Sequence, residues 1–143
     1  MPIVRITLRA GTPARKQQAI ADGVHKAMVE AFGIPEKDRF LIIDERPAGA
    51  MMFDPTYLLD GHRENVVLVE ITVVPGRATE TKRAFYRTVA DKLQAAGVRR
   101  EDVFVMLYES QRENWSVGNG EAQLLDPELL RRHGWTPPGE RPR

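Results

Sequence analysis

The chain contains one structural pattern twice, and this internal repeat limits its possible folds more than any other feature. Residues 3–8 alternate apolar and polar side chains, as a half-buried strand does, and residues 65–74 form a second run rich in β-branched residues. Each run is followed by a break at a glycine, Gly11 or Gly76, then by apolar residues at helical spacing and then by another apolar run. The chain therefore reads as two β-α-β units in tandem.

The two copies also align where each helix returns to the sheet. Gly33 corresponds to Gly97 and Asp38 to Asp102, in "GIPEKDRFLIIDE" and "GVRREDVFVMLYE". Each glycine stands where a helix is expected to end, and Thr12 and Thr79 stand where N-caps are expected. The pattern predicts strands at 3–8, 40–43, 65–74 and 103–109, and helices at 13–32 and 80–96.

Because a β-α-β crossover joins parallel strands, two such units side by side give one four-stranded sheet with both helices on one face. This is an α/β (α+β) fold. Its other face would carry apolar side chains without cover, so we expect an oligomer. We assign one domain to residues 1–135: units at 2–45 and 65–109, a connection at 46–64 with a short strand at 51–53, and a tail at 110–135 with a short helix at 127–133. The Pro-rich segment 136–143 is expected to be disordered.

Composition excludes several classes of function. The net charge is +1 with no clustering of Lys and Arg, so we expect neither a nucleic-acid nor a membrane partner. The chain has no cysteine, and its three histidines have no metal-ligand spacing, which argues against a metal site. It lacks both a membrane-length apolar run and a signal peptide, so a cytoplasmic location is expected.

The start of the chain, "MPIVRITLRAGT", offers a candidate catalytic group. A Met followed by a small residue is normally removed, which would leave Pro2 with a free secondary amine. An α-amino group titrates near 7.7–8.0 and lower when buried, so it can act as a general acid or base near neutral pH. The alternative is that Pro2 only begins a strand, where its missing N–H costs little.

Together with the tandem repeat, this start resembles the tautomerase superfamily, and within it the malonate semialdehyde decarboxylase-like group. The segments that carry the resemblance are "MPIVRITLRAGT", "DGVHKAMVEAFGIPEKDRF", "NVVLVEITVVPGRATETKRAFY" and "ENWSVGNGEAQ". The resemblance covers most of residues 2–123. It implies a homotrimer around a barrel-like core, an active site built on the terminal proline, and neither a metal nor an organic cofactor.

The resemblance also implies roles for individual residues. Pro2 stands where the family keeps its catalytic proline, Asp38 where the decarboxylases keep a paired aspartate, and Arg77 where they keep a carboxylate-binding arginine. A second arginine of the decarboxylase pattern is replaced by Pro75, which puts decarboxylation in doubt. Trp115 matches an aromatic residue of the pocket wall.

The residues themselves leave alternatives open. Asp38 recurs as Asp102, so it can be a turn or capping device instead of a catalytic group. Arg39 and Tyr57 are candidates for contact with substrate, although an exposed arginine usually only faces solvent and Tyr57 can simply pack the connecting loop.

Three functions remain as hypotheses. The first is a cofactor-independent tautomerase that interconverts the keto and enol forms of a 2-keto acid, so its partner would be a small carboxylate substrate. The second is a decarboxylase or hydratase that acts on 3-oxo or unsaturated acids. The third is a non-catalytic oligomeric binding protein, since a fold does not determine a function.

Overall fold

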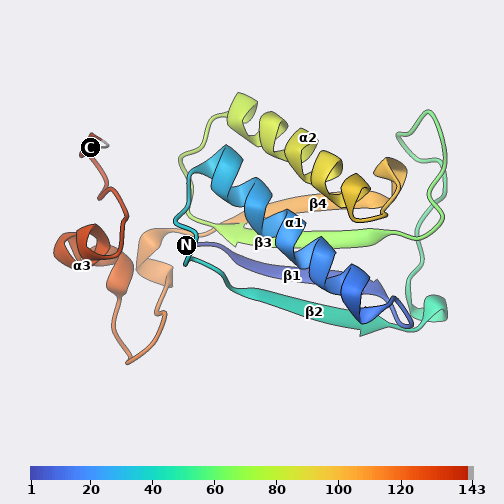
Figure 1. The fold of residues 1–143 in the computed structure, drawn as a ribbon. Coiled ribbons are helices and arrows are strands. Elements are labelled where there is room, and N and C mark those ends of the chain that lie inside the picture. The colour runs from blue at the N-terminus through green and yellow to red at the C-terminus, as the bar shows by residue number, and fades with distance from the viewer. Residues whose placement is uncertain (142–143) are drawn as a thin grey trace.

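The computed structural model describes residues 1–141, which fold into a four-stranded sheet with two long helices on one face (Figure 1). The expected α/β fold with a tandem β-α-β repeat is confirmed. The first unit consists of β1 (Ile3–Arg9), α1 (Ala14–Phe32) and β2 (Leu41–Arg46). The second unit consists of β3 (Val67–Val73), α2 (Thr79–Ala95) and β4 (Val103–Glu109).

The strand order β2-β1-β3-β4 decides which loops meet. The pairs β1–β2 and β3–β4 are parallel, whereas the two units join through the antiparallel pair β1–β3, with Ile6 opposite Val69. β1 and β2 therefore begin at the end of the sheet where β3 and β4 finish. The N-terminus, the loop before β2 and the segments after β3 and β4 all lie at this end (Figure 1).

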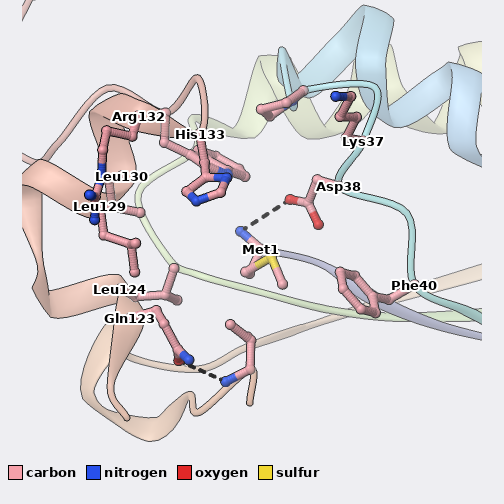
Figure 2. A pocket seen from close by; sticks show the side chains of 13 residues that line it. Met1, Lys37, Asp38, Phe40, Gln123, Leu124, Leu129, Leu130, Arg132 and His133 are labelled. Atoms are coloured by element: carbon pink, nitrogen blue, oxygen red, sulfur yellow. Dashed lines mark hydrogen bonds and ion pairs between the residues drawn. The ribbon is translucent and has the colours of Figure 1, made fainter. Parts of the chain in front are cut away.

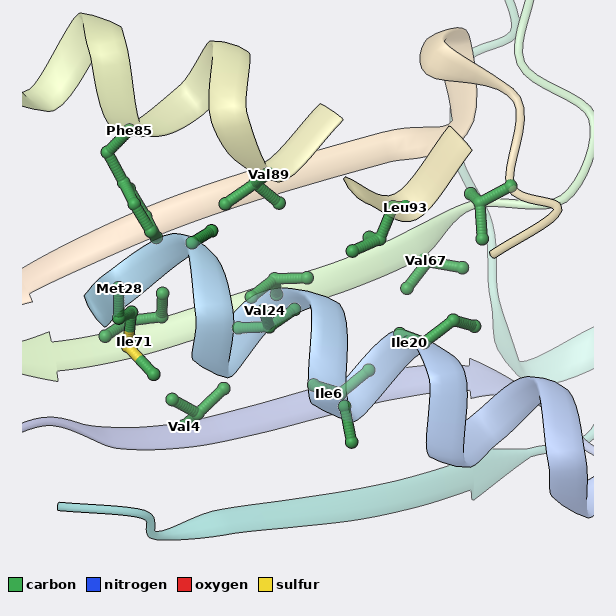
Figure 3. Packing of buried hydrophobic residues seen from close by; sticks show 14 of the residues in the cluster. Val4, Ile6, Ile20, Val24, Met28, Val67, Ile71, Phe85, Val89 and Leu93 are labelled. Carbon is green, nitrogen blue, oxygen red and sulfur yellow. The ribbon is translucent and has the colours of Figure 1, made fainter. Parts of the chain in front are cut away.

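The core lies between the sheet and the two helices (Figure 3). Alternate residues of β1 and β3 face the helices and are buried, as the period of two predicts. The helices supply apolar side chains at helical spacing, and the rings of Phe32 and Phe85 stack with centroids 4.3 Å apart. The fully buried side chains include Val4, Ile6, Leu8, Ile20, Val24, Met28, Val69, Ile71, Phe85, Val89 and Leu93.

The opposite face of the sheet carries large apolar side chains in contact with solvent. Met106 and Tyr108 on β4 remain 46% and 42% exposed, and Ile42 on β2 remains 42% exposed. The Tyr108 hydroxyl donates a hydrogen bond of 3.0 Å to Glu70 on β3. The expectation that a single chain leaves this face without cover is confirmed.

Some local predictions are wrong. Neither long helix has a side-chain N-cap. The hydroxyl of Thr12 instead donates to the Arg9 carbonyl at 2.6 Å and closes the preceding turn, and Thr79 is already the first residue of α2. Residues 51–53 form no strand, because the chain leaves β2 through the short 3₁₀ helix Ala48–Ala50 and finds no strand to pair with.

The tail after β4 returns to the N-terminal end of the sheet. It contains the 3₁₀ helices Arg112–Asn114 and Gln123–Leu125 and the expected short helix, α3 (Pro127–Arg132). The segment predicted to be disordered is described as far as residue 141, where Pro137 is buried and Glu140 pairs with Arg131; residues 142–143 lie outside the described part. No helix within residues 1–141 is long and apolar enough to cross a membrane.

Candidate active site

A buried amine and a buried carboxylate face each other at the end of the sheet where β1 begins. The amine of Met1 lies 3.7 Å from Oδ2 of Asp38, which precedes β2 in the chain, and Pro2 between Met1 and β1 is buried (Figure 2). Asp38 is only 6% exposed. This separation exceeds a hydrogen-bond distance, so the two groups interact through charge alone, and neither carboxylate oxygen has a hydrogen-bond partner among residues 1–141.

The surroundings favour the neutral form of both groups. The pKa of the Met1 amine is lowered from 8.0 to about 6, chiefly by burial and in smaller part by the charges of Arg77 and Arg112, while the charge of Asp38 opposes the change. Burial likewise raises the pKa of Asp38, against the opposing influence of the amine, His25 and Arg77. An amine in this position is therefore mainly neutral, and able to accept a proton, at neutral pH.

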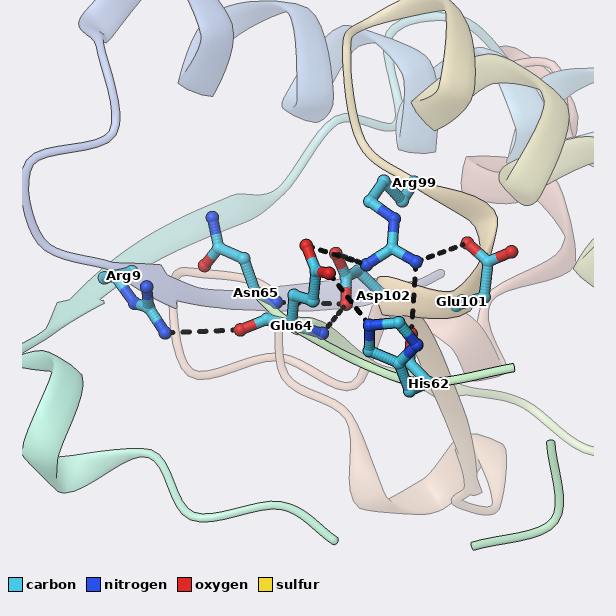
Figure 4. A network of polar contacts seen from close by, with 7 residues as sticks. All are labelled: Arg9, His62, Glu64, Asn65, Arg99, Glu101 and Asp102. Carbon is cyan, nitrogen blue, oxygen red and sulfur yellow. Dashed lines mark hydrogen bonds and ion pairs between the residues drawn. The ribbon is translucent and has the colours of Figure 1, made fainter. Parts of the chain in front are cut away.

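The two equivalent aspartates of the repeat have different surroundings. Its counterpart Asp102 lies at the opposite end of the sheet, where Oδ1 accepts backbone N–H groups from Glu64 at 2.8 Å and Asn65 at 3.0 Å (Figure 4). Arg99 adds a charged contact to the same carboxylate at 4.0 Å. Asp102 thus anchors the chain that enters β3. Asp38 has no such backbone partner and faces the amine instead.

Arg77 lies beside this pair in the segment that joins β3 to α2. Its guanidinium carbon is 4.5 Å from the centre of the Phe32 ring, and Nη1 donates to the Val74 carbonyl at 3.3 Å. Burial lowers the pKa of Arg77, and the positive charge of Arg112 lowers it further. The guanidinium still stays protonated, as arginine does in proteins. The positive charges of Arg77 and Arg112 favour binding of an anion such as a carboxylate, and so does the N-terminus of α2, which has no side-chain cap.

A cavity of about 490 Å³ opens next to the amine and Asp38. One side is the loop before β2, and the opposite side is the C-terminal tail (Figure 2). Its apolar lining consists of Pro35, Phe40, Val117, Leu124, Leu129, Leu130 and Trp135, and its polar lining of Lys37, Asp38, Gln123, Arg132 and His133. The site thus combines a proton-accepting group, a carboxylate, cations and an apolar wall.

The structure gathers only part of the residues predicted from the sequence. Asp38 lies beside the amine that precedes the buried Pro2, and the charge of Arg77 acts on both groups. Trp115 and Met1 pack against one small apolar cluster, and Trp115 Nε1 donates to the Ser110 carbonyl at 3.2 Å. Arg39 does not join them, because its guanidinium turns toward α1 and pairs with Asp22, whose pKa it lowers.

Tyr57 does not reach this site either. It lies in the loop between β2 and β3, which joins the opposite end of the sheet, and its side chain and that of Leu58 are 68% and 84% exposed. The alternative that Tyr57 packs the connecting loop is therefore wrong as well. The loop is held instead by backbone acceptors at Asp54 and Tyr57, which receive hydrogen bonds from Arg63.

Sequence reasoning missed Arg112 and the part of the cavity wall that α3 and the chain beside it supply. Arg112 follows β4 and directly precedes the "ENWSVG" motif. Parallel strands β3 and β4 finish at the same end of the sheet, so a cation soon after β4 could have been expected at the same end as Arg77. His25 is buried on α1, and its Nε2 contacts the Glu36 carbonyl at 2.8 Å, which ties down the loop that carries Asp38. Within residues 1–141, no three His, Asp or Glu side chains gather in a way that could hold a metal ion.

Comparisons with known proteins agree with this architecture. A family model described as a tautomerase enzyme matches residues 38–118, and a second model with the same description matches residues 2–61. The probable tautomerase YusQ of Bacillus subtilis (strain 168) is 37% identical over 127 residues, covering 88% of this chain and 100% of that protein.

Two solved structures show the same fold. The malonate semialdehyde decarboxylase FG41, inhibited by 3-bromopropiolate, is 32% identical with a TM-score of 0.83, and the match covers 88% of this chain and 96% of that one. A fused 4-OT described as a symmetric trimer shares the fold at 21% identity, with a TM-score of 0.70 over 83% of this chain and 94% of that one. From the matching family models, the full-length relative and the shared fold, it follows that this chain belongs to the tautomerase family.

Proposed function

We propose that this protein is a cofactor-independent tautomerase that interconverts the keto and enol forms of a 2-keto acid, with the amine of Pro2 as the proton shuttle. The observation that carries the proposal is the Met1 amine beside Asp38; burial and the nearby charge of Arg77 lower the pKa of this amine to about 6. An amine that is neutral at pH 7 can take a proton from substrate and return it.

The proposal requires removal of Met1. While Met1 is present, the Pro2 nitrogen is part of a peptide bond and carries no proton. Removal leaves a secondary amine at Pro2, a buried residue that directly follows Met1. Support comes from the tautomerase family model whose match begins at residue 2.

The reaction follows from the positions of the groups. Arg77, held by Phe32 and the Val74 carbonyl, binds the substrate carboxylate, and Arg112 adds a second positive charge. In ketonisation the neutral Pro2 amine removes the enol O–H proton, and the resulting ammonium delivers a proton to C3. One O–H bond breaks, one C–H bond forms, and the amine returns to its neutral state. Asp38 stabilises the transient ammonium by its charge.

A second candidate is decarboxylation or hydration of 3-oxo or unsaturated acids. The match to malonate semialdehyde decarboxylase FG41 over nearly its whole length favours it, as does the buried Asp38 beside the amine. In that reaction Pro2 is needed as a protonated acid, so the rate would fall as pH rises through the pKa of the amine. The lowered pKa of the amine at this position favours the tautomerase instead.

We further propose that the chain forms a homotrimer in the cytoplasm. The apolar side chains on the free face of the sheet support association, because so much exposed apolar surface usually marks an interface. Sedimentation of the purified protein tests the trimer, and fractionation of the host cell tests the location.

The proposed activity is tested on one sample of purified protein. Its intact mass shows whether Met1 is absent, and the ketonisation of enol phenylpyruvate is followed spectroscopically. Pro2→Ala is expected to reduce kcat/KM by about 100-fold or more, the typical contribution of a general base. Pro13→Ala, a change of the exposed proline before α1, serves as the matched control. Wild-type activity in Pro2→Ala, or retention of Met1 in the active protein, would exclude the proposed mechanism.

A further inference from the structure

The loop between α1 and β2 carries Asp38 and determines how far its carboxylate lies from the terminal amine. Both carboxylate oxygens are buried without a hydrogen-bond partner among residues 1–141. The separation of 3.7 Å between Oδ2 and the Met1 amine therefore depends on where the loop lies (Figure 2). Because the interaction of two charges varies inversely with their separation, a shift of this loop would change the pKa of the amine.

A side chain of α1 holds this loop in place. His25 is only 5% exposed, and its Nε2 lies 2.8 Å from the carbonyl oxygen of Glu36, two residues before Asp38. Since a carbonyl oxygen only accepts, Nε2 carries the proton and donates it to the hydrogen bond. Loss of this bond is costly, because it leaves a buried carbonyl oxygen without a donor.

Another contact between α1 and the loop is weaker. The guanidinium of Arg39 pairs with Asp22, but the two side chains are 38% and 43% exposed. Exposed ion pairs contribute little to stability, since water screens both charges. The buried hydrogen bond from His25 is therefore the main restraint that α1 places on the residues that flank Asp38.

The second unit of the repeat has no counterpart of this histidine. Val24 and Val89 occupy corresponding positions in the two units, and both are fully buried (Figure 3). The next residue is His25 in α1 but Ala90 in α2, which has no side-chain donor. Asp102 in the second unit is held instead by two backbone N–H groups. The histidine thus accompanies the aspartate that lacks backbone donors.

We propose that His25 is a positioning residue for the proton shuttle, and that its Nε2–H holds the loop so that the Asp38 carboxylate stays next to the amine. The inference rests on the proposed function and adds a residue to it. His25 acts through its hydrogen bond to the Glu36 carbonyl and does not touch the substrate. A positive charge on His25 would also lower the pKa of Asp38, so the test separates the hydrogen bond from the charge.

The test compares two amides at position 25 in the protein without Met1, its mass verified. In His25→Gln the amide N–H reaches about as far as Nε2 and can donate to the Glu36 carbonyl. In His25→Asn the side chain is one methylene shorter and falls short of it. Neither amide carries a charge. The readout is the pKa of the Pro2 amine, measured by ¹⁵N NMR titration and by the pH dependence of kcat/KM for enol phenylpyruvate.

His25→Asn is expected to lower the midpoint by about 0.5 pH unit, because a retreat of Asp38 to about twice its present distance halves the charge interaction that raises the amine pKa. His25→Gln should keep the wild-type midpoint. Val89→Ala, which creates a cavity in the core, is the control for general destabilisation. It should lower the urea midpoint and leave the pH midpoint unchanged. Equal pH midpoints in the two amide variants would overturn the proposal.

A double variant tests whether His25 acts through Asp38. With Asp38→Asn, position 38 carries no charge, so the addition of His25→Asn should produce no further shift. His25→Leu, which packs without a polar group and also lacks the donor, takes the place of His25→Asn if that variant does not fold. A second shift of similar size in the double variant would overturn the proposal, because His25 would then act on the amine without Asp38.

Failure of this inference can be told apart from failure of the proposed function, because the NMR titration needs no turnover. If enol phenylpyruvate is turned over and Pro2→Ala abolishes the activity, but both amide variants keep the wild-type midpoint, the shuttle stands and the role of His25 is wrong. If no keto acid is turned over while His25→Asn alone shifts the NMR midpoint, His25 positions Asp38 and the proposed function fails.

Discussion

Replacement of Asp38 by Asn is expected to move the acid limb of the pH–rate profile toward lower pH. In the wild-type protein without Met1, kcat/KM for ketonisation should fall as pH drops through a value near 6, because the pKa of the Met1 amine at this position is lowered from 8.0 to about 6. At a pKa of about 6, roughly nine-tenths of the amine is neutral at pH 7, compared with about one-tenth at a pKa of 8.

The size of the shift follows from the geometry. Asp38 holds a negative charge 3.7 Å from the amine, and this charge raises the amine pKa against the larger effect of burial. Two unit charges at about 4 Å interact by about 1 kcal/mol even in a fully aqueous dielectric, which corresponds to somewhat less than one pKa unit, and by more in a partly buried site. Asp38→Asn should therefore lower the midpoint by about 1 pH unit.

The assay is kcat/KM for enol phenylpyruvate between pH 4.5 and 8, flanking the midpoint near 6 that the amine pKa suggests. Direct titration of ¹⁵N-labelled Pro2 by NMR supplies a second reading of the same pKa. Asp102→Asn is the matched control, because Asp102 lies at the other end of the sheet and should leave the midpoint unchanged. A wild-type rate that rises as pH falls, or a midpoint that stays or moves upward in Asp38→Asn, would refute this account of the site.

Three further outcomes are expected. Asp38→Ala should leave the free energy of unfolding at pH 7 unchanged or raise it by about 1 kcal/mol, because a carboxyl group whose pKa is raised by folding does not stabilise the fold above that pKa. Asp102→Ala should lower the free energy of unfolding by about 2 kcal/mol, because two backbone N–H groups lose their acceptor. Urea unfolding measures both changes. Phe32→Leu removes the ring under Arg77 and should raise KM about three-fold with little change in kcat, as steady-state kinetics will show. Met106→Glu places a charge on the free face of the sheet and should convert the proposed trimer to smaller species in sedimentation; an unchanged mass would place the interface elsewhere.

The elements of this fold could be predicted because local patterns repeat. Alternation in β1 and β3 and helical spacing in α1 and α2 place apolar side chains on one face, and Gly33 ends α1 with φ at +67°, a conformation that glycine adopts without strain. The caps were not predictable, since a threonine near a helix start can bond to the preceding turn instead. The Thr12 hydroxyl does so.

The candidate site was predictable only where the chain itself brings residues together or a family pattern names them. Pro2, Asp38 and Arg77 carry such signals. Arg39 lacks them, and its orientation depends on the nearby Asp22 of α1, an ion pair that no spacing in the sequence reveals. Arg112 was missed because its importance depends on where the tail lies after β4.

The sequence by itself determined the two β-α-β units and the buried face of each strand, since both follow from hydrophobic period and chain connectivity. Only the tertiary structure decided how the two equivalent aspartates differ. The antiparallel pairing of β1 with β3 brings the N-terminus, Arg77 and the tail to one end of the sheet and sends the connection between the units to the other. At that other end Asp102 receives backbone N–H groups, whereas Asp38 is buried beside an amine with no backbone donor, and burial without hydrogen bonds is what shifts the pKa values on which the proposed chemistry depends.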